Sequence, residues 1–189
     1  VVGDVNTQDV LKKIESAYGK IPSSTLPEVH LPIEPTQNGE KTVELHKEIS
    51  SEKFLIGYHT PNGNHPDYHA LEIAHCILLD GKSSRLQKIL INDKELATQS
   101  GGWVNQTKDP GLYIMDITMN PGKSMEQAFA VIDQQIDKLR NELVTDQELE
   151  KAKNRIETSF WSHFRTVDDK AELLGFHETV SLDYKKFFN

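Results

Sequence analysis

The feature that most constrains the fold is the separation of strand-like segments in the middle of the chain from long helices at its end. Residues 52–61 (EKFLIGYHTP), 97–106 (ATQSGGWVNQ) and 112–119 (LYIMDITM) are rich in the residues that strands favour. Residues 108–111 (KDPG) join the last two in a hairpin-like connection. The pattern predicts an α+β fold, with a mainly antiparallel sheet and helices packed on one face.

Capping-box sequences mark the helix starts in the last third of the chain. Ser124 with Gln127 and Thr145 with Glu148 both have the spacing in which side chains satisfy the free amides of a first helical turn. Apolar residues then recur at helical spacing after each start, and a last helix is expected over 167–181. Two further helices are predicted in the middle of the chain, at about 66–80 and 83–93.

The first 49 residues predict a less regular region. Residues 1–5 (VVGDV) and 41–49 (KTVELHKEI) are expected to be strands, and a helix is expected between Asn6 and Gly19. Four prolines within 21–39 predict an extended linker. Because the chain opens on an apolar pair without an initiator Met, we expect a fragment of a longer polypeptide whose targeting signal lies elsewhere. The sequence leaves open a periplasmic or cell-envelope location and a cytoplasmic one.

Composition excludes several classes of function. The formal net charge is −8, from 21 Lys and Arg against 29 Asp and Glu, which disfavours nucleic acid and anionic membranes as partners. The sequence contains no apolar run of the roughly 18 residues that a membrane helix needs, so no membrane insertion is expected. The single cysteine, Cys76, excludes an internal disulfide and is expected to be a packing thiol.

Histidines and a glutamate gather in residues 65–86 (HPDYHALEIAHCILLDGKSSRL) and raise the possibility of a zinc site. On a helix, His69 and His75 point roughly 120° apart, with Glu72 between them, so the three do not converge. The inverted zinc motif H-x-x-E-H begins at His69 but has Ile73 at its fifth position. We therefore predict no metal ligands here and expect these residues to form the polar rim of a packed helix.

The Gly81-Lys82-Ser83 sequence resembles the end of a phosphate-binding loop but lacks the rest of it. The motif G-x-x-x-x-G-K-[ST] needs a glycine where Cys76 stands, and it follows a strand, whereas a helix is expected here. The three residues are better interpreted as the end of one helix and the cap of the next. Since no nucleophile elbow is present either, the sequence predicts no catalytic residue in this chain.

In order along the chain, HPDYHALEIAHCILLDGKSSRLQKIL and VTDQELEKAKN (144–154) resemble the C-terminal domain of one half of an M16 zinc metallopeptidase, of the insulinase, pitrilysin or mitochondrial processing peptidase type, in a bacterial-type protein. The resemblance extends to about residue 175. The positions that carry it are expected to be structural, and they are His65, Pro66, Asp67, Asp80, Gly81, Ser83, Ser84, Arg85, Leu86, Glu148, Leu149, Ala152 and Lys153.

The resemblance implies a LuxS/MPP-like metallohydrolase fold, with residues 1–189 as a single M16 C-terminal-type domain. In that family an H-x-x-E-H helix and a later glutamate of the preceding domain hold zinc, and no residue here matches them. Zinc is therefore expected in the parent protein and not in this chain, which alone should be inactive. The arginine and tyrosine that help to hold substrate in non-catalytic halves correspond to Ile91 and Thr98, so the substrate-binding residues stay unassigned.

Two functions are compatible with the resemblance. The first is a non-catalytic domain of a zinc endopeptidase, which walls the substrate chamber and supports the zinc-bearing domain. The alternative is a structural or assembly subunit without protease activity, and an upstream H-x-x-E-H would distinguish the two. The implied partners are the N-terminal zinc-bearing domain, a second M16-type half and peptide substrates. Exposed sheet edges also leave open a homo-oligomer of the isolated chain.

Overall fold

The computed structural model describes residues 1–25, 27, 32 and 34–185. The chain forms two compact units, Val1–Glu48 and Ile49–Asn189. The first unit contains one helix, α1 (Thr7–Tyr18), in its described residues. The helix begins where the sequence predicts, because the Asn6 side chain accepts hydrogen bonds from the amides of Gln8 and Asp9. No residue of α1 is buried.

Two strands predicted in this part of the chain are absent. Neither 1–5 nor 41–49 is in a strand, and Val43 is 82% exposed. These predictions were wrong because β-forming side chains make a strand only where a neighbouring strand pairs with the backbone. Of the linker predicted at 21–39, residues 26, 28–31 and 33 lie outside the described residues, and the remainder forms neither helix nor strand.

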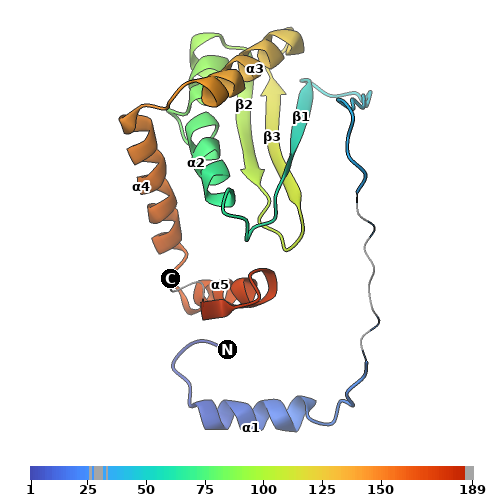
Figure 1. Ribbon diagram of the computed structural model, residues 1–189, viewed down its shortest axis with the longest axis vertical. Helices are drawn as coiled ribbons and strands as arrows, with labels where there is room; N and C mark the ends of the chain where they lie inside the picture. Colours follow the sequence, from blue (N-terminus) through green and yellow to red (C-terminus); the bar gives the residue numbers. More distant parts are fainter. Residues whose placement is uncertain (26, 28–31, 33, 186–189) are drawn as a thin grey trace. The chain divides into compact units, whose positions relative to one another are not determined.

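The second unit contains three strands and five helical segments among its described residues (Figure 1). The strands are β1 (Lys53–Thr60), β2 (Ala97–Val104) and β3 (Gly111–Met119). The helices are α2 (Tyr68–Leu78), α3 (Met125–Asn141), α4 (Asp146–Ser162) and α5 (Val167–Val180), together with a π-helix, η1 (Gln87–Asp93). None of these helices, nor α1, is both long and apolar enough to cross a membrane within the part of the chain that is described.

The sheet is antiparallel, with β3 between β1 and β2 (Figure 1). Ile114 in the middle of β3 lies opposite Gly57 of β1 and Trp103 of β2. The pairing of β2 shifts by one residue between Ala97 and Gln99. The α+β prediction with a mainly antiparallel sheet is therefore confirmed.

One face of the sheet is covered by helices. The buried side chains of β3 alternate along the strand and pack against the C-terminal end of α2, against η1 and against α3. At the β1 edge, the Phe54 and Phe129 rings lie 4.4 Å apart and connect the sheet to α3. Helix α4 forms a further layer, because Ala152 packs with Cys76 and Ile77 of α2. Helices thus pack on one face, as predicted.

The helix predicted over 83–93 is a π-helix over most of its length. The amide of Lys94 donates to the carbonyl of Ile89 five residues earlier, which is the wide-turn pattern. Leu86 and Leu90 on this segment are completely buried. The sequence predicted an ordinary helix because the four-residue spacing of these two leucines suits either kind of turn.

Candidate functional site

The start of α2 is built by the His-Pro-Asp sequence. The amide of Tyr68 donates to the carbonyl of His65, and the amide of Asp67 donates to the His65 ring Nδ1 at 3.2 Å. Asp67 is the N-cap residue, although its side chain makes no capping hydrogen bond. Its carboxylate lies at the helix end where the backbone dipole favours negative charge. Because these contacts join residues that are close in the sequence, they shape the turn into α2.

The turn after α2 is joined to α4 by an ion pair between Asp80 and Arg155. The Nη2 group of Arg155 donates to Asp80 Oδ1 at 2.5 Å, and its Nε group donates to Oδ2. This hydrogen bonding lowers the pKa of Asp80. Gly81 has φ of +92°, and a Cβ atom there would lie 3.1 Å from Arg155 Nη1. A glycine is therefore needed both for the turn and for the close approach of the guanidinium group.

A second ion pair joins the next turn to the start of α4. Arg85 Nε and Nη2 donate to Glu148 Oε1 and Oε2 at 2.6 and 2.9 Å, so the pair is bidentate. Glu148 also completes the capping box with Thr145. The Arg85 contact, aided by the Thr145 amide, lowers the pKa of Glu148 to about 2. One carboxylate thus fixes the helix start and connects it to the preceding layer.

The remaining motif positions surround these ion pairs. Lys151 donates to the hydroxyl of Ser83. Ser84 is buried, and its hydroxyl has no hydrogen-bond partner among the described residues. Leu86 and Ala152 are buried, Leu149 is half-buried and Lys153 is exposed. We use the name α2–α4 clamp for the contacts Asp80–Arg155, Ser83–Lys151 and Arg85–Glu148.

The histidines of α2 bind different partners. His69 Nδ1 lies 3.0 Å from Glu72 Oε2 on the exposed side of the helix. His75 lies with its ring edge-on to Tyr113 and its Nδ1 3.4 Å from the Tyr113 hydroxyl, and burial lowers its pKa. In residues 1–25, 27, 32 and 34–185, no group of three His, Cys, Asp or Glu side chains could hold a metal ion. The donor geometry therefore does not fit zinc at His69, Glu72 and His75.

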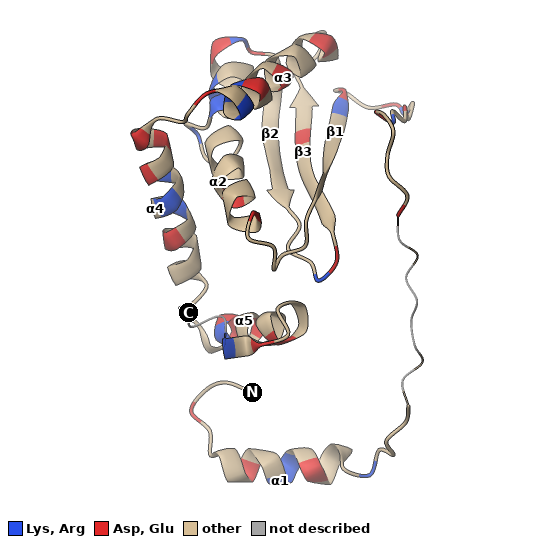
Figure 2. Cartoon of the chain, in the orientation of Figure 1, with Lys and Arg blue, Asp and Glu red and all other residues tan. Residues whose placement is uncertain are grey.

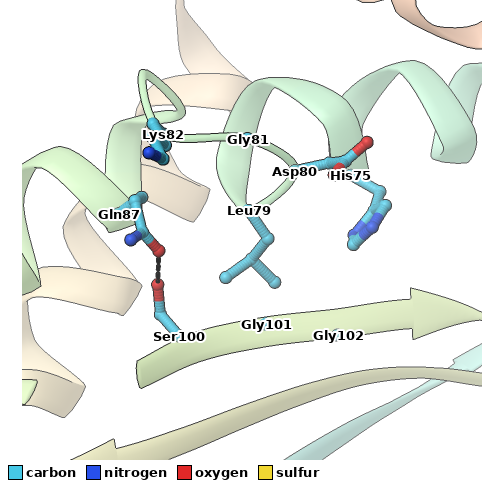
Figure 3. Close-up of a pocket in the computed structure, with 9 residues that line it drawn as sticks. All are labelled: His75, Leu79, Asp80, Gly81, Lys82, Gln87, Ser100, Gly101 and Gly102. Carbon is cyan, nitrogen blue, oxygen red and sulfur yellow. Dashed lines mark hydrogen bonds between the residues drawn. The ribbon is translucent and has the colours of Figure 1, made fainter. Parts of the chain in front are cut away.

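A shallow pocket of about 290 Å³ lies between the end of α2 and strand β2 (Figure 3). Its lining is His75, Leu79, Asp80, Gly81, Lys82, Gln87, Ser100, Gly101 and Gly102. The close-up shows Gln87 bonded to Ser100, at 2.9 Å. Since Asp80 is also paired with Arg155, three of the polar side chains that line the pocket are already engaged within the protein. The pocket presents no nucleophile with an activating base.

Cys76 is unsuited to catalysis. The residue is buried, and burial raises the pKa of its thiol to about 11. A thiol must lose its proton to act as a nucleophile, so this group is inert near neutral pH. The prediction of a packing thiol is consistent with its position beside Ala152.

Ile91 and Thr98, the two positions that the resemblance aligned with substrate-holding residues, have structural contacts here. Ile91 is half-buried and packs against the main core. Thr98 lies on β2, and its hydroxyl donates to the carbonyl of Thr118 at 3.3 Å. Neither side chain carries a charge or a phenol.

The sheet face opposite the helices was not singled out from the sequence. Leu55 and Trp103, on the two outer strands, are 62% and 48% exposed on that face. Ile114 and Leu112 of β3 lie between the outer strands in the same alternation. The strands are mostly free of charged residues (Figure 2). We call this surface the open sheet face, and it is made by Leu55, Trp103, Leu112 and Ile114. The signal for it in the sequence was the period-two alternation of side chains along the strands.

Arg155 and Lys151 were also missed, although their spacing carried a signal. They follow Glu148 by seven and three residues, which places all three on one side of a helix. The sequence could show this shared side but not which segment would lie opposite it.

Comparison with known proteins places the chain in a family. The sequence model of the family described as "Peptidase M16 inactive domain" matches residues 1–156. Zinc protease PqqE of Helicobacter pylori is 32% identical over 179 residues, which are 93% of this chain and 40% of that protein. The chain thus spans less than half the length of this curated relative.

Solved structures agree with this match. A protease from Helicobacter pylori superimposes with a TM-score of 0.86 and 29% identity, over 99% of this chain and 47% of that one. A peptidase M16 inactive domain from Pseudomonas fluorescens has a TM-score of 0.73 over 97% of this chain and 43% of that one, and at 19% identity it shows the shared fold alone. Because the family match covers most of its length, the chain belongs to the peptidase M16 inactive domain family, the inactive C-terminal domains of zinc protease-like proteins.

Proposed function

We propose that this chain is the non-catalytic C-terminal domain of an M16 zinc endopeptidase, in which it walls the substrate chamber and supports a zinc-bearing domain that lies outside residues 1–189. The observation that carries the proposal is the open sheet face, which exposes Leu55 and Trp103, whereas helices pack on the opposite face. We further propose that residues 1–189 act together as one M16 C-terminal-type domain.

The scaffold role is supported by the α2–α4 clamp. Its two ion pairs have donor–acceptor distances of 2.5 to 2.9 Å, and they hold two helical layers together. The family-motif positions of residues 80–86 and 148–153 are therefore proposed to be structural. A rigid layer behind the sheet suits a domain that must keep a neighbouring active site in shape.

The wall role is supported by the shape and chemistry of the sheet. Each outer strand pairs with one described strand only, so an extended peptide can add to a sheet edge through backbone hydrogen bonds. Such bonding demands little of the peptide sequence. The apolar side chains of the open sheet face would contact side chains of the same peptide, which suits internal peptide bonds of many sequences.

The test compares the isolated chain with the longer parent protein in peptide cleavage and zinc content. We expect cleavage and bound zinc in the parent, and neither in the isolated chain. In the parent, Trp103→Ala on the open sheet face should raise KM several-fold and leave zinc content unchanged. Leu143→Ala, at the exposed connection between α3 and α4, is the matched control and should leave both unchanged.

Other outcomes would overturn the proposal in different ways. Stoichiometric zinc and cleavage in the isolated chain would show that the histidines of α2 form a site after all. A parent that is inert and free of metal would favour the structural or assembly subunit. If Trp103→Ala leaves the KM of the parent unchanged, the open sheet face does not contact the substrate.

A further inference from the structure

One carboxylate lies beside the apolar side chains of the open sheet face. Asp116 follows Leu112 and Ile114 along β3 in the same alternation, away from the buried side chains of that strand. Asp116 is the only acidic residue of the three described strands, and Lys53 of β1 is their only Lys or Arg. Figure 2 shows both, as an acidic band on β3 and a basic band at the start of β1. A single acidic group on an apolar surface is well placed to give specificity to what binds there.

The Asp116 carboxylate has one partner and one unpaired oxygen. Its Oδ2 lies 2.9 Å from Lys53 Nζ, and the Lys53 side chain is 49% exposed. Its Oδ1 is shielded from water and has no hydrogen-bond partner among the residues that the structure describes. A shielded carboxylate oxygen without a donor costs free energy that an N–H group of a ligand can recover. Since the Asp116 side chain is 21% exposed and its carboxylate can rotate about the Cβ–Cγ bond, a donor can reach it from the open sheet face.

An open space lies beside this carboxylate. Asp116 is paired with Gly101 of β2, and Trp103 lies two residues further along the same strand and face. A Cβ atom at Gly101 would meet nothing within 4 Å. Side chains directly opposite one another in an antiparallel pair are about 5 Å apart, and diagonal ones about 7–8 Å. The space over Gly101 is therefore bordered by Asp116 on β3 and by the half-exposed Trp103 on β2.

We propose that the space over Gly101 is a subsite for an arginine side chain of a bound peptide, with Asp116 as the specificity-determining residue. A guanidinium group can donate to both oxygens of a carboxylate at once, whereas Lys53 contacts only Oδ2. The same planar cation is attracted by the face of a tryptophan ring such as that of Trp103. Because surface ion pairs are weak, the half-exposed Lys53 can turn into solvent when arginine arrives. The formal net charge of −8 also favours a cationic peptide.

NMR titration of the purified chain with blocked peptides tests the subsite. The peptides carry Arg, Lys or citrulline between alanines, and citrulline has the shape of arginine without its charge. We expect the Trp103 indole N–H signal to shift, with a dissociation constant about tenfold lower for the Arg peptide than for the citrulline peptide and several-fold lower than for the Lys peptide. The signal of Trp161, the other tryptophan of the chain, should not move. Equal affinity for the Arg and citrulline peptides would overturn the proposal.

Substitutions at the subsite should have opposite effects. Asp116→Asn should abolish the difference between the Arg and citrulline peptides. Gly101→Leu should fill the space while circular dichroism stays unchanged, because nothing lies near a Cβ atom there. Lys53→Met frees Oδ2 and should lower the dissociation constant of the Arg peptide several-fold. If Lys53→Met instead weakened Arg binding as much as Asp116→Asn does, the two residues would form a structural pair only and the proposal would fail.

Glu157→Gln is the matched control. Glu157 Oε1 accepts a hydrogen bond from the Trp161 indole at 3.4 Å, so this residue is also a carboxylate beside a tryptophan. The substitution removes the same charge from the chain as Asp116→Asn and should leave the preference for Arg unchanged. An equal loss of preference in both variants would show attraction by net charge alone, which would rule out the subsite.

The inference rests on the proposed function for the source of the peptide, and cleavage by the parent protein separates the two. Asp116→Asn should raise the KM of the parent for Arg-containing peptides several-fold and leave the KM for citrulline peptides unchanged. If Trp103→Ala raises KM but Asp116→Asn does not, the arginine subsite fails and the wall role stands. If the isolated chain prefers the Arg peptide but neither substitution alters KM, the subsite stands and the wall role fails.

Discussion

The Glu148 carboxylate has two structural roles: it forms an ion pair with Arg85, and it completes the capping box of α4. A carboxyl whose pKa is lower in the folded than in the unfolded state stabilises the fold above the unfolded value, and this stabilisation is lost as the pH falls toward the folded value. For Glu148 the window runs from about 4.5 down to about 2. Because solvent screens a surface pair, we expect a contribution of about 1–2 kcal/mol at neutral pH.

The measurement is urea unfolding followed by circular dichroism at a series of pH values. In Glu148→Gln the amide can still accept the capping hydrogen bond, but the free energy of unfolding should fall less steeply between pH 4.5 and 2. Arg85→Met removes the partner and should flatten the same part of the curve. An acid limb that is identical in all three proteins would show that the ion pair contributes nothing to stability.

Two neighbouring glycines of β2, Gly101 and Gly102, should differ in how much stability they lose on substitution. A Cβ atom at Gly102 would fall on the carbonyl oxygen of Ile114 and within 3.0 Å of Leu79 Cδ1, whereas one at Gly101 would meet nothing within 4 Å. We expect Gly102→Ala to lower the free energy of unfolding by about 2–3 kcal/mol and Gly101→Ala to change it by less than about 0.5 kcal/mol. Urea unfolding of both variants checks this, and equal losses would contradict it.

Among the elements, β3 and α1 are opposite extremes in strand pairing and side-chain burial. Strand β3 pairs on both sides and buries alternate side chains in the main core, whereas α1 buries none. Amide hydrogen exchange should therefore be slowest in β3, and the α1 amides should exchange orders of magnitude faster, since a short helix without a packed face is barely stable in water. If α1 were protected as strongly as β3, its apolar side chains would have to pack against a partner in solution.

The elements also show how far the sequence could be used for prediction. The start of α4 and the three strands of the sheet followed from local signals, because a capping box and an alternating pattern act over a few residues. Residues 41–49 carry the same kind of strand signal but form none, since pairing depends on a partner that propensity does not supply. The π-helical geometry of η1 was not predicted for a related reason, because the spacing of its leucines fits two kinds of helix.

The same limit applies to the site. The divergence of His69 and His75 followed from helical geometry alone, and the structure gives them separate partners. The ion pair of Arg85 with Glu148 joins residues 63 positions apart. No local rule connects such positions, so the motifs could be named from the sequence while their contacts could not.

At the scale of the whole molecule, we predict that the purified chain does not bind zinc. Zinc added to the purified chain should produce no stoichiometric binding heat in calorimetry, because the candidate ligands on α2 bind other partners. His75→Ala should give the same calorimetric trace as the unsubstituted chain. One equivalent of zinc bound by the chain and lost in His75→Ala would contradict both expectations.

The α2–α4 clamp also has a consequence for synthesis on the ribosome. Its two ion pairs join residues 63 and 75 positions apart, and the later partner in each pair belongs to α4. During synthesis, Asp80 and Arg85 therefore lack their ion-pair partners until Glu148 and Arg155 have left the exit tunnel. Until then the apolar side of α2 stays available to chaperones, so a nascent chain stalled before residue 155 should be a better chaperone client than one stalled after α4.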